Sequence, residues 1–339
     1  MVSQSFLTAN APDGGLLQSD EWARLQVASG RESFPFSGVG FEGHAFRYSL
    51  PALGNYLSIP RGPIIDLSGF ASEELRAALS EIARSTGAAW IRIEPQADEV
   101  LAALRQAFGE QEVVPAPRDI NPRETFTASL DGRLADWLSR MKPKVRYNVR
   151  LAEKHGVTVR FTRQPQDVET FLDLIASTAS RKSIAPHQRS YYQSFFTALP
   201  ENMCTLALAE HGDIPLAGAL VVFFAGTAYY LHGGSSDLRR ELMAPFLLHF
   251  KCMEEAKRCG MRRYDFGGVR IRTKRGVGDT DWDGITRFKQ GFAPDADPIV
   301  FPGTYDIIIS PARYAIYRQS RRLAGLRRIF QSMLSHLPL

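Results

Sequence analysis

A lysine flanked by large apolar residues is the most chemically distinctive feature of the sequence. Lys289 stands between Phe288 and Phe292 in the segment DWDGITRFKQGF, residues 281–292. Such a lysine either extends its ammonium to water along an apolar surface or holds it in a cleft where a negative group arrives. The first arrangement is the commoner one, so these residues alone leave both functions open.

A second group of candidate residues lies on a predicted helix. Apolar residues recur every three or four positions over Asp131–His155, and Pro143 should break this helix or kink it, because proline removes a backbone donor. Its second part carries a basic cluster: Lys142, Lys144, Arg146, Arg150 and Lys154. This cluster is either a solvated helix face or a contact surface for a phosphate backbone.

The segment YDFGGV, residues 264–269, combines a carboxylate with two glycines. Asp265 lies in a predicted strand at 263–266, and Gly267 and Gly268 are predicted to form a tight turn after it. The carboxylate would either act on an incoming amine, as a base or acceptor, or fix the turn through backbone hydrogen bonds.

Three other kinds of motif give little support for a nucleotide site, a metal site or a catalytic triad. Gly38–Gly43 matches GxGxxG but precedes another strand-like run instead of a helix, which argues against dinucleotide binding. Asp279, Asp281 and Asp283 have calcium-like spacing without the glutamate at the twelfth position, so we predict no metal site. No Ser/His/Asp or Cys/His arrangement can be assembled from spacing.

Length and composition place the chain among folded globular proteins. Its 339 residues exceed the ~250–300 of a usual single core, so we predict two domains. A net charge of +5 permits an anionic partner such as nucleic acid or a lipid surface. The three cysteines form neither a CxxC pair nor a His/Cys cluster, which fits a reduced cytoplasmic setting. No apolar run reaches the ~18–20 residues of a membrane span, and the first residues do not resemble a signal peptide.

Predicted strands and helices alternate along the chain. Short apolar runs between residues 15 and 66 predict strands and turns, followed by a helix capped by Ser72 and ending at Gly87, a strand at 89–93 and a helix at 99–108. A proline-rich connector leads into the second half. There the predicted order is helix, strand at 157–161, helices at 168–180 and 191–199, three strands at 205–209, 216–224 and 228–232, a helix at 245–258 and the strand at 263–266. This order is that of the GNAT N-acyltransferase fold.

Several motifs occur in the order in which they occur in one family. They are PRGPIIDL (60–67), WIRIEP (90–95), NPRETFTASL (121–130), KPKVRYNVRLAEKHGVTV (142–159), YDFGGV (264–269), RFKQGF (287–292) and PGTYDI (302–307). This set resembles the Fem family of peptidoglycan-bridge peptidyltransferases, which use aminoacyl-tRNA. The resemblance implies an α/β (α+β) fold of two GNAT-like acyltransferase domains with mixed sheets flanked by helices. No long heptad insertion is present, so we expect no coiled-coil arm.

The resemblance also implies a reaction and the residues that perform it. An aminoacyl group would move from aminoacyl-tRNA, as co-substrate, to an amine of a UDP-linked or lipid-linked muropeptide precursor, without a cofactor. Phe288 and Lys289 would line the reaction site, Arg181 would contact precursor phosphates, and Tyr230 would line the peptide channel. Asp265, Gly267 and Gly268 would belong to the same substrate site.

The sequence departs from the family pattern at two places. Family members often carry a lysine four residues after an early tryptophan, where it contacts precursor phosphates. Here Gln26 follows Trp22 at that distance, which leaves Arg24 as the only nearby basic candidate for binding this substrate. The insert Arg270–Gly278 is unusually basic, with Arg272, Lys274 and Arg275 as candidates for a tRNA clamp beside the basic helix.

Two alternative functions stay open. An acyl-CoA-dependent N-acyltransferase of a polysaccharide or lipid pathway would need glycines that cradle the pyrophosphate at a strand-to-helix junction, and the junction SSDLRRELMAP, residues 235–245, contains none. A non-catalytic RNA- or membrane-binding protein is the other.

The sequence predicts three segments. Residues 1–125 would form the first GNAT-like domain, residues 126–310 the second, which carries the reaction site, and residues 311–339 a basic amphipathic helix. That helix would either pack on the protein's own core or contact the inner face of the membrane from the cytoplasm.

Overall fold

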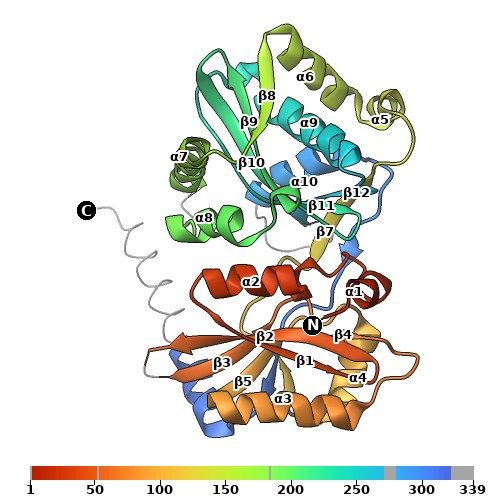
Figure 1. Cartoon of the computed structure of the whole chain (residues 1–339), viewed down its shortest axis with the longest axis vertical. Helices are drawn as coiled ribbons and strands as arrows, with labels where there is room; N and C mark the ends of the chain where they lie inside the picture. Colours follow the sequence, from red (N-terminus) through yellow and green to blue (C-terminus); the bar gives the residue numbers. More distant parts are fainter. Residues whose placement is uncertain (1, 52, 183–184, 271–279, 322–339) are drawn as a thin grey trace.

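The computed structural model describes residues 2–51, 53–182, 185–270 and 280–321, and these form two halves stacked along the long axis of the molecule (Figure 1). Each half is built on a mixed sheet. The first has the strand order β1-β2-β3-β5-β14-β6 with β4 paired to β2, and the second has the order β13-β7-β12-β11-β10-β9-β8. One neighbouring pair in each sheet is parallel, β3 with β5 and β11 with β12.

The first half comprises the early elements of the chain. These are α1 (Gln4–Asn10), η1 (Leu16–Gln18), α2 (Asp20–Ala28), β1 (Glu32–Gly38), β2 (Phe41–Leu50), β3 (Gly54–Ile59), β4 (Ile64–Ile65), α3 (Ser72–Thr86), β5 (Ala88–Ile93), α4 (Asp98–Phe108) and β6 (Val113–Pro115). Apolar side chains of α3 and α4 pack on one face of the sheet, and residues of α2 pack on the other.

The predicted strands, turns and helices of this half are largely confirmed, with two corrections. Residues 20–28 form a helix instead of a strand or turn, because Ser19 caps it with its Oγ accepting from the Trp22 N–H. The helix that follows the strands is capped by Ala71, and Ser72 is its first residue. As predicted, this helix ends at Gly87, whose φ of 63° is left-handed.

The second half contains the later elements. They are β7 (Glu124–Ser129), α5 (Leu134–Arg140), α6 (Pro143–Lys154), β8 (Val157–Thr162), α7 (Pro165–Lys182), α8 (Arg189–Ala198), η2 (Glu201–Met203), β9 (Cys204–His211), β10 (Ile214–Phe224), β11 (Thr227–Ser235), η3 (Arg240–Leu242), α9 (Ala244–Arg258), β12 (Arg263–Val269), α10 (Thr280–Gln290) and β13 (Ile299–Val300). The predicted antiparallel meander is β9–β10–β11, and Pro143 does divide α5 from α6. Helices α6 and α9 pack on one face of the sheet, and α7 and α8 pack on the other.

Gly267 and Gly268 are not a turn after the strand, as predicted, but lie inside β12. The strand continues to Val269 with an irregular register against β7 between Asp265 and Gly268. Gly267 has a φ of 72°, which a glycine adopts without strain. The two glycines therefore bend a continuous strand instead of ending it.

The chain crosses between the halves more than once. Strand β14 (Tyr305–Ile308) pairs with β5 and β6 of the first sheet, although it falls in the range expected for the second domain. Its apolar side chains complete the first core, so this part of the range is wrong. Residues of α2 share an apolar cluster with α7 and α8, and the Trp22 and Phe195 rings meet edge to face at 6.2 Å. A continuous apolar interface therefore joins the two halves.

The start of the predicted C-terminal helix packs on the first half. Residues 311–321 are helical, and Tyr314 and Tyr317 are buried against Trp90, with the Tyr317 and Trp90 rings stacked at 4.4 Å. Beneath them the buried Arg92 pairs with Asp306 at 2.8 Å. The rest of the predicted amphipathic helix lies outside the described residues.

Candidate active site

The candidate site lies where the parallel strands β11 and β12 part. Their pairing covers Thr227 to Tyr229 on β11 and ends at the pair Tyr229 and Asp265, although both strands continue beyond it. β12 stays beside β7, with the irregularity at Gly267 and Gly268. This leaves a wedge between two strands of the sheet, and several of the predicted site residues lie at it.

The side chain of Lys289 enters this wedge from α10. Its Nζ donates to the backbone oxygen of Gly268 at 2.7 Å and lies 6.0 Å from the centroid of the Tyr230 ring. Lys289 is only 9% exposed. The sequence left open whether this lysine extends to solvent or is held in a cleft, and the structure shows the second arrangement.

Burial is the main cause of the pKa shifts of the two ionisable side chains in the wedge, Lys289 and Asp265. It lowers the pKa of Lys289 from 10.5 to about 8, and the negative charge of Asp265 opposes this shift. Burial also raises the pKa of Asp265, whose Oδ1 accepts from Thr125 Oγ1 at 2.5 Å and from the Gly267 N–H at 2.6 Å. Asp265 thus fixes the bend of β12, the structural alternative considered for it, while it supplies a negative charge to Lys289.

An aromatic wall closes the wedge beside Lys289. The Phe288 ring lies 4.8 Å from Phe246 and 5.3 Å from His249, both on α9, and 5.3 Å from Phe292. Burial, with a contribution from the Lys289 charge, lowers the pKa of His249 to about 3, so this imidazole is neutral near pH 7. The Tyr230 ring completes the wall at 4.6 Å from His249. The side chains of this wall are therefore apolar or neutral, and the positive charge beside them is that of the Lys289 ammonium.

Sequence reasoning missed Phe246 and His249 as parts of this wall. Their spacing of three residues in PFLLHF, residues 245–250, places both on one face of a helix, which was the available signal. That spacing does not show which face meets Lys289.

A pocket of about 220 Å³ opens beside Phe288 and brings Arg181 to the site. Arg181 pairs with Asp237 at 2.6 Å and donates to Ser235 Oγ at 3.1 Å, at the end of β11. Arg239 and Arg240 also line this pocket. Arg181 therefore shares a pocket with the predicted reaction site, on a rim that contains three arginines.

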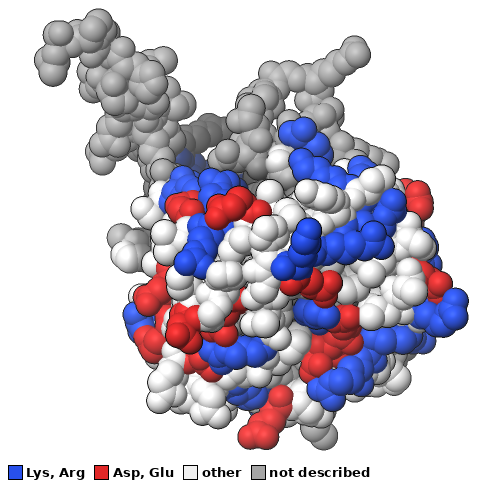
Figure 2. All heavy atoms as spheres, turned by 90° about the horizontal axis from the view of Figure 1, so that it is seen from above, with Lys and Arg blue, Asp and Glu red and all other residues white. Residues whose placement is uncertain are grey.

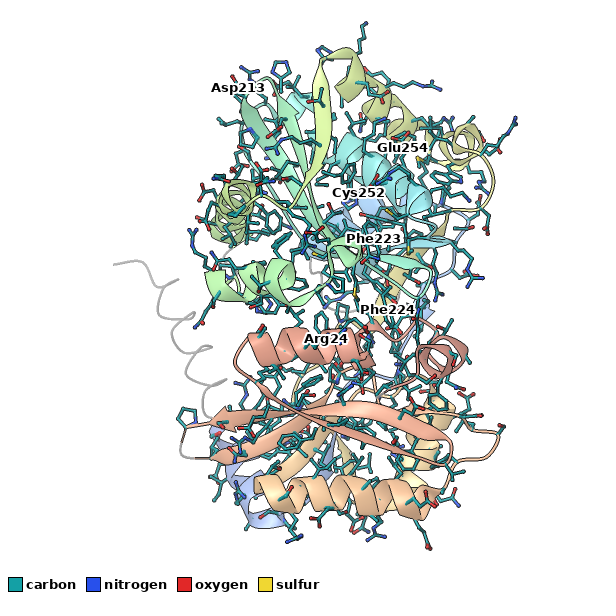
Figure 3. All side chains as sticks on the ribbon, viewed as in Figure 1. Arg24, Asp213, Phe223, Phe224, Cys252 and Glu254 are labelled. Atoms are coloured by element: carbon teal, nitrogen blue, oxygen red, sulfur yellow. The ribbon has the colours of Figure 1, made fainter. Side chains whose placement is uncertain are left out.

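Arg24 lies elsewhere, on α2 at the boundary between the halves (Figure 3). It pairs with Glu21 at 2.9 Å, and its side chain is 57% exposed. The contacts of Arg24 in the described structure do not connect it to Lys289, so its predicted role in substrate binding has no geometric support here.

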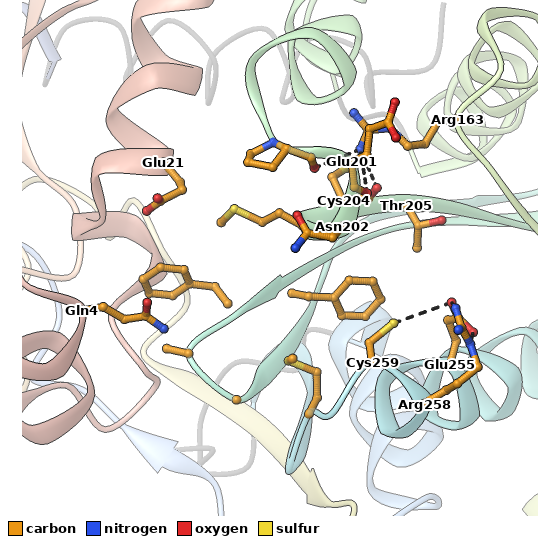
Figure 4. A pocket seen from close by; sticks show the side chains of 17 residues that line it. Gln4, Glu21, Arg163, Glu201, Asn202, Cys204, Thr205, Glu255, Arg258 and Cys259 are labelled. Carbon is orange, nitrogen blue, oxygen red and sulfur yellow. Dashed lines mark hydrogen bonds and ion pairs between the residues drawn. The ribbon is translucent and has the colours of Figure 1, made fainter.

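A larger cavity, of about 700 Å³, is also separate from Lys289 (Figure 4). Gln4 and Glu21 line it from the first half, and Glu255, Arg258 and Cys259 line it from α9. Several of its charged groups already have partners: Arg258 pairs with Glu255, and Arg163 donates to the backbone oxygens of Phe196, Leu199 and Cys204. Size alone therefore does not identify the site.

The predicted basic cluster lies on α6 and immediately before it, at the far end of the second half. Lys142, Lys144, Arg150 and Lys154 are exposed, and Figure 2 views the molecule from this end, where Lys and Arg side chains gather in several groups. Arg146 is half-buried, and its guanidinium donates to the oxygens of Ser139 and Met141, which the break at Pro143 leaves without helical donors. Arg272, Lys274 and Arg275 lie outside the described residues.

The basic helix adjoins the reaction site at its start. The Lys142 N–H donates to the Gly291 oxygen at 2.9 Å, directly after α10. A Cβ on Gly291 would lie 2.5 Å from Val145 Cγ2, so the two segments touch. The exposed cations of α6 therefore begin next to Gly291, the residue that follows the helix carrying Lys289.

The chain is similar to known acyltransferases. Residues 139–289 match the acetyltransferase (GNAT) domain family. The lipid II:glycine glycyltransferase of Staphylococcus saprophyticus is 24% identical over 394 aligned positions, covering 92% of each chain, and that of Staphylococcus aureus strain N315 is 24% identical over 397 positions, covering 91% of each.

Solved structures show the same fold. The crystal structure of FemX superposes with a TM-score of 0.76 at 21% identity, covering 93% of this chain and 98% of that one. The C-terminal domain of a putative lysylphosphatidylglycerol synthetase from Agrobacterium fabrum gives a TM-score of 0.56 at 15% identity, covering 94% and 97%.

The family match shows a GNAT domain in the second half, and together with the named relatives it supports an acyl- or aminoacyltransferase. The chain is similar to lipid II:glycine glycyltransferases over most of its length and shares the fold of FemX, so both the resemblance and the fold class predicted from its motifs are confirmed. The 394 aligned positions exceed the 339 residues of this chain, so the relative carries inserted segments that this chain lacks. The longest described helix, α7, has 18 residues, and the described part of the chain contains no coiled-coil arm.

None of the helices formed by the described residues combines the length and the apolar character needed to cross a membrane. Within the same residues, no three His, Cys, Asp or Glu side chains are grouped so that they could bind a metal ion. The side chains of Asp279, Asp281 and Asp283 lie outside the described set.

Proposed function

We propose that the protein transfers an aminoacyl group from aminoacyl-tRNA to an amine of a peptidoglycan precursor, forming part of a cell-wall bridge. The observation that carries the proposal is the buried Lys289 amine, bound to Gly268 in the wedge between β11 and β12. The relatives named lipid II:glycine glycyltransferase favour glycine as the transferred group and a lipid-linked precursor as its acceptor.

The chemistry needs few groups. The acceptor amine attacks the carbonyl carbon of the aminoacyl ester, the C–O bond to the ribose breaks, and the amine proton leaves to the ribose oxygen or to water. Because the ester already has a good leaving group, positioning and stabilisation of the developing oxyanion are the main requirements. With a pKa of about 8, most Lys289 side chains are protonated at pH 7, so an ammonium is present in a site of low polarity.

The Arg181 pocket suits the anionic part of a substrate. Arg181, Arg239 and Arg240 line it with Phe288, and Asp237 balances part of their charge. A phosphate entering this pocket would compete with Asp237 for Arg181, since an arginine fork binds either group. The pocket therefore fits a precursor phosphate close to the reaction wedge.

The exposed face of α6 suits the RNA. Lys144, Tyr147, Arg150 and Lys154 follow one another at three- and four-residue spacing, and Tyr147 is 64% exposed. Cations on such a face contact phosphates, and an aromatic ring among them can stack on a base. The tRNA would lie across this face, with its aminoacylated end at α10.

The double variant Arg150→Gln/Lys154→Gln should weaken binding of charged tRNA without changing the affinity for the precursor. Each lost phosphate contact lowers the slope of log affinity against log salt by about 0.7–0.9, so the expected decrease is about 1.5. Binding measured over a salt series tests this. The control is Arg76→Gln/Arg84→Gln on α3, which removes two exposed cations from the other half. Equal slopes for the two variants would contradict the role of α6.

The pH dependence of the transfer rate should reflect the pKa of Lys289 and the influence of Asp265 on it. Protonated Lys289 is lost as the pH rises through about 8, while the acceptor amine gains its reactive neutral form, so the transfer rate should pass through a maximum. Asp265→Asn removes the charge that raises the Lys289 pKa, and the decline should then begin at lower pH. Single-turnover rates between about pH 6.5 and 9.5 measure this. A decline at unchanged or higher pH in the variant would contradict the assignment.

A transfer assay tests the proposed function itself. Radiolabel in a mixture of charged tRNAs is offered to purified UDP-linked and lipid-linked precursors, and parallel reactions contain labelled acyl-CoA instead. Label on a precursor from charged tRNA supports the proposal and identifies both amino acid and acceptor. Acylation from acyl-CoA alone would mean that the fold is right and the donor is wrong.

A further inference from the structure

A buried arginine of the first half reaches toward the reaction wedge. Arg61 follows β3, is 6% exposed, and has a φ of 51°, a left-handed conformation that is costly for a residue with a side chain. Its N–H donates to Glu94 Oε2 at 3.1 Å, and its own oxygen accepts from Gln96 Nε2. Both partners follow β5, so the first half holds the Arg61 backbone at two points.

The side chain of Arg61 reaches from the first half to the connector between the sheets. Its Nη2 donates to the Pro122 oxygen at 2.6 Å, and its guanidinium carbon lies 3.5 Å from the centroid of the Phe301 ring. Its Nε is 3.9 Å from Asp13 Oδ2. A planar guanidinium can donate and stack at once, which an ammonium cannot do.

The connector in turn touches the strand that binds Lys289. A Cβ on Gly268 would lie 2.3 Å from Pro122 Cγ, so the proline ring packs directly on Gly268. The oxygen of that same glycine accepts the hydrogen bond from the Lys289 ammonium. Glu94 holds the preceding residue, Asn121, through its N–H at 2.9 Å and its Nδ2 at 2.5 Å. The contacts therefore run without interruption from Arg61 to Pro122, Gly268 and Lys289.

We infer that Arg61 is a positioning residue for Lys289. It fixes Pro122, and Pro122 holds β12 where the Gly268 oxygen receives the ammonium and where water is kept out. The first half thus sets the geometry of a reaction site to which it contributes no reacting group. The inference deepens the proposed function by naming a residue that controls the same site, and it rests on that function only for its rate measurements.

The test compares conservative variants of two buried arginines. Arg61→Lys keeps the charge but loses the fork that joins Pro122 and Phe301, and Arg92→Lys alters an arginine of the same half that pairs with Asp306 instead. A third variant, Pro122→Ala, removes the ring from Gly268 at a half-buried position and should fold even if the Arg61 variant does not. Thermal unfolding of each variant gives the loss of stability against which the other readouts are judged.

The first readout needs no substrate. Trace acetylation of lysines across a pH series, followed by mass spectrometry, gives the pKa of the Lys289 amine in the free protein. In Arg61→Lys and Pro122→Ala, water should reach the wedge and this pKa should rise from about 8 toward its ordinary value of 10.5, because burial is the main cause of its lowering. In Arg92→Lys it should stay unchanged even where stability falls.

The second readout is transfer, where Arg61→Lys should lower kcat about tenfold with little change in KM, because orientation is lost and binding is kept. Superimposable Lys289 titrations in wild type, Arg61→Lys and Pro122→Ala would overturn the inference, as would an equal shift in Arg92→Lys. If wild type transfers nothing, the titrations still decide the role of Arg61, so failure of the proposed function is distinguishable from failure of the inference.

Discussion

Lys289→Met should lower the rate of aminoacyl transfer by roughly 100- to 1,000-fold, the usual cost of removing one group that stabilises a developing oxyanion. Methionine fills a similar space along the aromatic wall, so the loss is one of charge and of the bond to Gly268. Substrate binding should change less than the rate, since the ammonium acts mainly in the transition state. Single-turnover rates with both substrates saturating measure the effect.

The same variant should be more stable than wild type at pH 7. Lowering the Lys289 pKa from 10.5 to about 8 corresponds to about 3 kcal/mol against the folded state, and loss of the hydrogen bond offsets part of the gain, leaving about 1–2 kcal/mol. Between pH 8 and 10.5 the unfolded wild type binds more protons at this lysine than the folded protein, so wild-type stability rises with pH there and the difference disappears. Denaturant unfolding at about pH 7 and pH 10 measures both values.

Lys257→Met is the matched control. The Lys257 Nζ also donates to a backbone oxygen, that of Leu130 at 2.8 Å, but this lysine is exposed and away from the wedge. It should change neither the transfer rate nor the pH dependence of stability by much. Equal losses of activity in the two variants, or a Lys289→Met protein that is fully active, would remove Lys289 from the reaction.

Gly268→Ala should lower transfer by about 100-fold, because displacing a positioned group by even 1 Å can have that effect. The added Cβ would lie 2.3 Å from Pro122 Cγ, so either the connector or β12 must move, and the oxygen that holds Lys289 moves with β12. Such overpacking should also cost about 1–3 kcal/mol of stability. Transfer rates and the urea midpoint measure the two effects.

Gly284→Ala separates this steric effect from a general one. Gly284 lies on α10, the helix that carries Lys289, and a Cβ there meets nothing within 4 Å. The substitution should be neutral or stabilise by about 0.5–1 kcal/mol, since alanine favours helix. If Gly268→Ala were as active as Gly284→Ala, the position of the Gly268 oxygen would not matter to catalysis.

Local patterns were sufficient for most of the fold. The break at Pro143, the meander of β9, β10 and β11, and the stop of α3 at Gly87 follow from proline, turn residues and glycine acting within a few residues. The helix at 20–28 was missed because its signal was a single capping serine in a segment rich in glycine and proline. Strand β14 was placed in the wrong half because its partners, β5 and β6, lie about two hundred residues earlier in the chain.

The reaction site was only partly predictable, because its properties come from long-range contacts. The Fem-like motifs pointed to Phe288 and Lys289, but the burial of Lys289 depends on α9 and on the separation of β11 from β12. The sequence shows the charge of Arg146, but it does not show the bonds of its guanidinium to the carbonyl oxygens before Pro143. Arg61 belongs to the motif PRGPIIDL, but the sequence assigned it no role, because its link to Lys289 passes through Pro122 and Gly268.

The most direct measurement is transfer of glycine from purified glycyl-tRNA to a purified lipid-linked precursor, with the product identified by mass spectrometry. Wild type should add glycine to the precursor amine and Lys289→Met should add very little, while uncharged tRNA with free glycine gives no product. Transfer that proceeds equally without charged tRNA, or at the same rate in the absence of the Lys289 amine, would contradict the central claim that this buried lysine serves aminoacyl transfer from tRNA.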